Sequence, residues 1–117
     1  MIPQSEWEWF GSPGHFIAAR DCQFRMATRV GKWLISTVGE YYPSGMNSEM
    51  SLGGDGRIYE TMVFAAGKPC RTKTCKCGMP KINGRELELL GAFQRGDAAK
   101  NHMAMCAKWA KKEKADA

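Results

Sequence analysis

Residues 22–42, CQFRMATRVGKWLISTVGEYY, decide the fold, because two runs of strand-favouring side chains flank Gly31-Lys32. Glycine at the first central position of a two-residue turn supplies the positive φ that a type II′ hairpin requires. The turn then sets the register, and Val30 faces Trp33. The sequence therefore predicts an antiparallel β-hairpin at this place.

The hairpin register divides its side chains between two faces. We expect the core face to carry Cys22, Phe24, Met26, Thr28, Val30, Trp33, Ile35 and Tyr41. We expect the opposite face, partly solvated, to carry Gln23, Arg25, Ala27, Arg29, Leu34, Ser36, Val38 and Glu40. Alternation of this kind is typical of a sheet with one covered face.

The pattern changes along the chain from strands to helices. A third strand is predicted at 57–65, after a loop rich in glycine and serine, and a short helix at 84–93. Asp97 is expected to cap a final helix over 98–114. Strands followed by helices predict an α+β fold, a small antiparallel sheet followed by a zinc-fastened loop and two C-terminal helices.

The length of 117 residues predicts a single domain over 1–117. Charge divides this domain into two parts. Residues 1–67, the β-rich part, carry five basic and seven acidic side chains, net −2. Residues 68–117, the cysteine-rich basic loop and the helices, carry twelve basic and five acidic side chains, net +7. The basic part suits phosphate or an acidic protein surface, and a solvated lysine-rich tail is the alternative.

The cysteines of the basic part predict a zinc site. His102 and Cys106 are four residues apart on the predicted final helix and so share one of its faces. Cys75 and Cys77 precede Gly78, which lets the chain turn tightly. Thiolate sulfur and imidazole nitrogen are zinc ligands, so we expect Cys75, Cys77, His102 and Cys106 to bind one structural zinc ion.

Other interpretations of these cysteines stay open. Cys70 has an acceptable spacing and can replace one of the four ligands. Free thiols or a redox pair are the alternatives to a metal. Four protein ligands close a zinc site, so catalysis would need an open position and a base such as Glu40, Glu60 or His15. No motif places such a base, and we predict no catalytic residue.

No run approaches the roughly 18 apolar residues that a membrane span needs. The start, MIPQSEWEWFGSPGHFI, has acidic residues and tryptophans where a secretory signal has lysines and an apolar run. The sequence therefore predicts a cytoplasmic protein.

Several segments resemble small proteins encoded by bacteriophages and other bacterial mobile elements. They read WFGSPGHFIAARDCQFRMATRVGKWLISTVGEYYP, YETMVFAAG, CKCGMP and NHMAMCAKWA, and they span most of the chain. The resemblance carries no biochemical activity. It implies a bacterial host cytoplasm and an accessory protein that acts on host or phage components, as anti-defence factors do.

Together these observations predict a zinc-binding, non-enzymatic accessory protein. We expect it to bind nucleic acid or a host protein that processes nucleic acid or acts in defence. The predicted contact residues are Arg71, Lys73, Lys76, Lys81, Lys108, Lys111 and Lys112. The alternative is a metal-dependent hydrolase or nucleic-acid-modifying enzyme with Glu40 or Glu60 as base.

Overall fold

The computed structural model describes residues 2–10, 21–43, 48–53, 55–69 and 80–115. One 3₁₀ turn, five strands and one long helix make up the regular structure of these residues. In chain order they are η1 (Gln4–Glu6), β1 (Glu8–Trp9), β2 (Cys22–Val30), β3 (Trp33–Tyr41), β4 (Tyr59–Pro69), β5 (Pro80–Ala92) and α2 (Arg95–Ala115).

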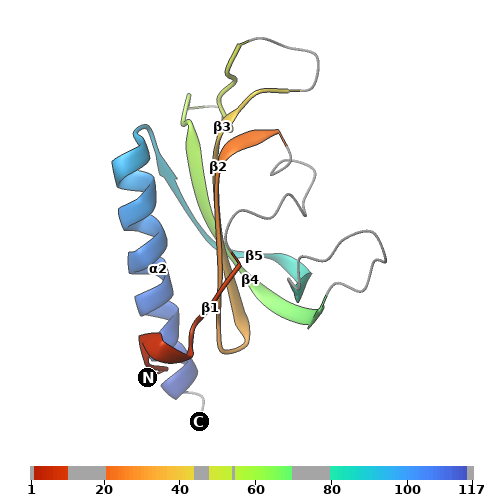
Figure 1. Ribbon diagram of the computed structural model, residues 1–117, viewed down its shortest axis with the longest axis vertical. Coiled ribbons are helices and arrows are strands. Elements are labelled where there is room, and N and C mark those ends of the chain that lie inside the picture. The colour runs from red at the N-terminus through yellow and green to blue at the C-terminus, as the bar shows by residue number, and fades with distance from the viewer. Residues whose placement is uncertain (1, 11–20, 44–47, 54, 70–79, 116–117) are drawn as a thin grey trace.

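The strands form one antiparallel sheet in the order β1-β2-β3-β4-β5, and each strand pairs with its neighbour in sequence. Helix α2 lies along one face of this sheet (Figure 1). Since β5 pairs with β4, the basic part of the chain shares its sheet with the β-rich part.

The predicted hairpin is confirmed. Val30 lies opposite Trp33 and Thr28 opposite Ile35, in the predicted register. Gly31 has φ of 61°, the positive value that a type II′ turn requires at this position. The third predicted strand is also present, as β4 from Tyr59 to Pro69.

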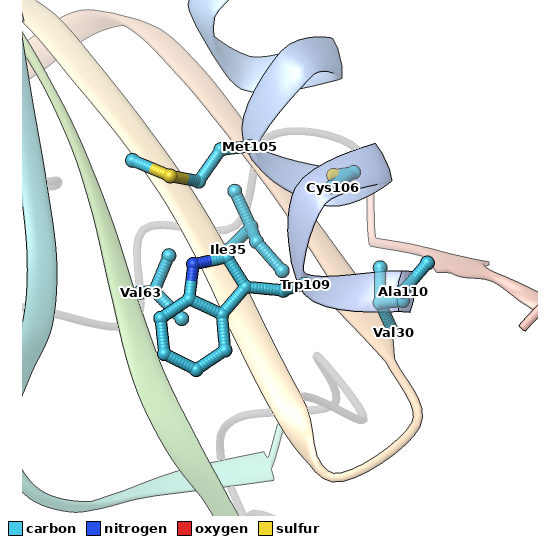
Figure 2. Packing of buried hydrophobic residues seen from close by; sticks show 7 residues of the cluster. All are labelled: Val30, Ile35, Val63, Met105, Cys106, Trp109 and Ala110. Atoms are coloured by element: carbon cyan, nitrogen blue, oxygen red, sulfur yellow. The ribbon is translucent and has the colours of Figure 1, made fainter. Parts of the chain in front are cut away.

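The main core lies between α2 and the sheet. Trp109 of α2 packs across Ile35 and Val63, and the rings of Trp109 and Trp33 meet edge to face with centroids 4.8 Å apart (Figure 2). The buried members of this cluster are Val30, Ile35, Val63, Met105, Cys106, Trp109 and Ala110. Seven buried side chains of this kind make the helix an integral layer of the fold.

The opposite sheet face is more covered than the sequence predicts. Ala27 is 5% exposed and Leu34 fully buried. Phe10, Ala66 and Ile82 pack against these two side chains. The far ends of β4 and β5 therefore contribute to a second, smaller core, which one hairpin considered alone cannot reveal.

The predicted helix at 84–93 is wrong, because residues 84–92 belong to β5, Pro80–Ala92. Leu89 lies opposite Met62 and Leu90 opposite Thr61 of β4. The segment Glu86-Leu87-Glu88-Leu89 alternates with period two, which is the strand period. Pairing with β4 outweighs the modest helix preference of leucine and glutamate.

The predicted fold class is corrected accordingly. The described residues hold one C-terminal helix instead of two, and α2 begins at Arg95, so Asp97 lies in its first turn and does not cap it. The described residues also show no zinc-fastened loop, since they contain no group of three or more residues able to hold a metal ion. Helix α2 instead docks through apolar side chains.

Candidate binding surface

The predicted site residues fall into two groups. Cys70, Cys75 and Cys77, together with Arg71, Lys73 and Lys76, lie outside the described residues. Lys81 falls within β5, but its side chain is outside the described part. The structure thus describes the side chains of the helix half of the prediction alone: His102, Cys106, Lys108, Lys111 and Lys112.

His102 is fully buried between α2 and the sheet. Its Nε2 lies 2.8 Å from Oγ1 of Thr28 and its Nδ1 lies 2.7 Å from Oγ1 of Thr37. A neutral imidazole has one N–H, so one ring nitrogen donates and the other accepts. Oγ1 of Thr37 also lies 2.8 Å from Oγ1 of Thr61, which extends the buried polar chain to β4.

Burial sets the protonation of this cluster. It lowers the pKa of His102 to about 4, so the imidazole is neutral at physiological pH. It raises the pKa of the Cys106 thiol to about 12, against a hydrogen bond with Thr28 that lowers it. Zinc binds thiolate sulfur, and neither His102 nitrogen is free here. The zinc site stays a prediction, because Cys75 and Cys77 lie outside the described residues.

Glu40 joins the end of β3 to the start of α2. Its carboxylate accepts hydrogen bonds from the Tyr59 hydroxyl at 2.7 Å and from Nε of Arg95 at 2.7 Å. Its φ of 56° lies in the left-handed region, a cost that these bonds offset. The hydrogen bond from Arg95 lowers the pKa of Glu40, which makes this carboxylate a weak base.

Glu60, the other candidate base, lies on the opposite face of the sheet from His102. Its neighbour Thr61 faces α2 and joins the buried polar chain, and alternation along β4 turns Glu60 away. Burial raises the pKa of Glu60. The sheet therefore separates this carboxylate from the predicted helix ligands.

The three predicted lysine contacts of α2 are exposed near its C-terminal end. Lys108 forms an ion pair with Glu88 of β5 at 2.5 Å. The ammonium group of Lys112 lies 4.2 Å from the centroid of the Trp109 ring. Spacings of three and four residues place Lys108, Lys111 and Lys112 on one side of the helix, beside β5.

Sequence reasoning missed the apolar side chains that accompany these lysines. Leu87 is 50% exposed, Leu89 36%, Leu90 38% and Phe93 61%. A helix at 84–93 would have had a buried face for these leucines, whereas strand β5, at the end of the sheet, leaves Leu87 and Leu90 exposed. The signal that could have found them is the alternation of Glu86-Leu87-Glu88-Leu89.

We call these exposed residues of β5 and α2 together the β5 border: Leu87, Leu89, Leu90 and Phe93 with Lys108, Lys111 and Lys112. Leu87 and Leu89 lie on the sheet face away from the lysines, and Leu90 lies on the face that α2 covers. Three exposed leucines within four residues of one strand are an unusual amount of exposed apolar surface for a single strand, and exposed apolar surface marks interaction sites when it is contiguous. The ion pair between Lys108 and Glu88 ties the two halves of the border together. It is the candidate functional site.

Comparison with known proteins adds no relative: no family model, curated protein or solved structure matches this chain. The described residues include no helix that is both long and apolar enough to cross a membrane. The function is therefore argued from the geometry of the β5 border.

Proposed function

We propose that this chain is a non-enzymatic binding protein that acts by stoichiometric contact with an acidic protein partner. The observation that carries this proposal is the β5 border, where one strand exposes leucines on both faces of the sheet and α2 exposes lysines on one of them. Apolar side chains supply affinity when they are removed from water, and lysines favour a partner of opposite charge.

The apolar share of the border favours a protein over nucleic acid. Interfaces with nucleic acid are more polar and more positively charged than interfaces between proteins. Nucleic acid remains the second candidate, supported by the net charge of +7 over 68–117.

The described residues give less support to a metal-dependent hydrolase. Glu40 is occupied by Arg95 and Tyr59, and its pKa is lowered. Glu60 is on the face of the sheet away from His102. A general base must reach the proton that it removes, and neither carboxylate lies beside the buried histidine.

The cellular setting of this proposal rests on the resemblance to phage and mobile-element proteins. In such a setting the acidic partner is a host protein that processes nucleic acid or takes part in defence. A small basic binder in the bacterial cytoplasm would inhibit or redirect its host partner.

The test is capture of partners from a nuclease-treated bacterial lysate, followed by reconstitution with the purified partner. We expect a one-to-one complex that the variant K108Q/K111Q/K112Q weakens by about tenfold, because three attractive charges are lost. The control K32Q/K68Q/K100Q removes the same charge from exposed lysines elsewhere. Equal weakening by both variants contradicts a specific border, and capture that succeeds only from a lysate without nuclease treatment shows nucleic acid as the ligand.

A further inference from the structure

Strand β5 is the last strand in the sheet order, and none of the described residues pairs with its outer edge. Its residues Glu88 to Ala92 form a regular ladder with β4. An edge strand presents unpaired N–H and C=O groups that can pair with another chain. Natural edges are usually short, charged or bulged, and this one carries exposed leucines interspersed with the acidic residues Glu86 and Glu88.

The direction of the free backbone groups follows from one hydrogen bond. The carbonyl of Ala92 accepts from the backbone N–H of Ile58, 3.1 Å away beside β4. Because backbone groups alternate along an antiparallel strand, those of Leu89 and Gly91 point to the outer edge. The side-chain amide of Asn101 donates a hydrogen bond to the carbonyl of Gly91 at 3.4 Å, which agrees with an outward direction of that carbonyl.

The side chains beside this edge differ between the two faces. Leu89 lies opposite Met62 on the face away from α2, and alternation puts Leu87 there as well. The α2 face carries Lys108, which pairs with Glu88, and Lys112 one turn further along the helix. A strand laid along the edge would therefore meet Leu87 and Leu89 on one face, and Leu90 with the lysines of α2 on the other.

We propose that β5 binds its partner by strand addition. An extended segment of the partner, with apolar and acidic side chains in alternation, pairs with the outer edge of β5. The apolar side chains pack on Leu87 and Leu89, and the acidic ones face Lys108 and Lys112. This inference rests on the proposed function and specifies what the acidic partner must present.

Charge argues against a second copy of this chain as the occupant. Antiparallel pairing of two β5 strands would relate the copies by a two-fold axis perpendicular to the joint sheet. Both α2 helices would then lie on the same face, with their lysines directed toward each other. Each chain also carries a net charge of +5. Like charges brought together in this way disfavour self-pairing, whereas an acidic strand offsets them.

The test uses a synthetic peptide of alternating valine and glutamate, about eight residues long, the length of an ordinary strand. Binding is measured by titration calorimetry, and hydrogen exchange follows the amides of Leu89 and Gly91. We expect saturable binding and slower exchange at these two amides. The same peptide with alternate backbone nitrogens methylated should bind about tenfold more weakly, because it cannot complete the ladder. A valine–lysine peptide should not bind measurably.

Two variants of the protein complete the test. Leu89→Pro removes an N–H that points outward and is therefore compatible with the edge, and it should abolish peptide binding. Met50→Pro changes a comparably exposed residue that pairs with Tyr41 instead of β5, and it should leave binding unchanged. Far-UV circular dichroism checks the fold of both. If Leu89→Pro does not fold, the methylated peptide tests the ladder without it.

The outcomes separate this inference from the proposed function. Equal binding of the methylated and unmethylated peptides, or unchanged exchange at Leu89 and Gly91, overturns strand addition. A dimer on sedimentation that Leu89→Pro dissociates shows a second copy as the occupant and also overturns it. The proposed function survives either result if K108Q/K111Q/K112Q still selectively loses the partner, and it fails if that variant and its control behave alike.

Discussion

The Nδ1 atom of His102 lies 2.7 Å from Oγ1 of Thr37, inside the layer where α2 meets the sheet. With Thr28 on its other nitrogen and no exposed surface, this imidazole is a polar link between the helix and two strands. A buried histidine without a charged partner is stable in its neutral form alone. Its protonation therefore couples the fold to pH.

We predict that acid weakens the fold through His102. The folded-state pKa of about 4 lies below the usual value of about 6.5, so the unfolded chain binds the proton more readily. The contribution of neutral His102 to the unfolding free energy is fully present above pH 6.5. It decreases by about 3 kcal/mol as the pH falls to 4 and below. Urea unfolding at several pH values measures this loss. Glutamine does not titrate, so any pH dependence of the unfolding free energy that remains in His102→Gln comes from other groups.

Truncation of His102 should be among the most damaging single changes. His102→Ala leaves a buried cavity and removes one hydrogen-bond partner each from Thr28 and Thr37, which costs about 3 to 5 kcal/mol of unfolding free energy. His102→Gln can still donate and accept, and should cost about half as much. Lys100→Ala, at an exposed position of the same helix, should change stability by less than about 0.5 kcal/mol. Equal midpoints for the two His102 variants would contradict a hydrogen-bonding role.

We predict that a chelator leaves the docking of α2 intact, because the helix is held by apolar packing and by the threonine bonds. Treatment with EDTA should not lower the thermal midpoint followed by near-UV circular dichroism. Elemental analysis of the purified chain is made in parallel. A midpoint that falls with EDTA, recovers with zinc and is absent in Cys75→Ser would show that the metal reaches the helix ligands after all.

We predict that alanine substitution at two glycines changes the stability of the protein in opposite directions. A Cβ atom at Gly39 would lie 2.0 Å from the ring of Tyr59, so Gly39→Ala should cost about 1 to 3 kcal/mol. At Gly96, in the first turn of α2, a Cβ atom meets nothing within 4 Å. Gly96→Ala should stabilise the protein by up to about 1 kcal/mol. Thermal unfolding of the two variants measures both changes, and a gain at Gly39 would contradict the close packing on Tyr59.

The hairpin could be predicted because its information is local. Gly31 determines the turn, and the turn determines every cross-strand pair from Val30 outward. β5 could not be predicted in the same way, because its state depends on β4, a partner that only the tertiary fold supplies. Leucine and glutamate are good helix formers in isolation, so propensity pointed to the wrong element.

For the candidate site, too, the features with local information could be predicted and the others could not. The exposed lysines of α2 could be expected from their run near the helix end. The role of His102 could not, since a spacing of four residues on a helix is equally compatible with a metal and with two threonines on the facing strands. Thr28 and Thr37 are 65 or more positions away in the chain, and no local pattern links them to the histidine.

The position of α2 after all five strands has a consequence for biosynthesis. Chains emerge from the ribosome N-terminus first, so the whole sheet is made before the helix that covers it. Until α2 arrives, Ile35 and Val63 are open to water and to other chains, and the hydroxyl of Thr37 has no imidazole to bind. The nascent protein therefore passes through a stage in which the sheet is complete and the helix that covers it is still missing. A chaperone that shields this face of the sheet would act at that stage.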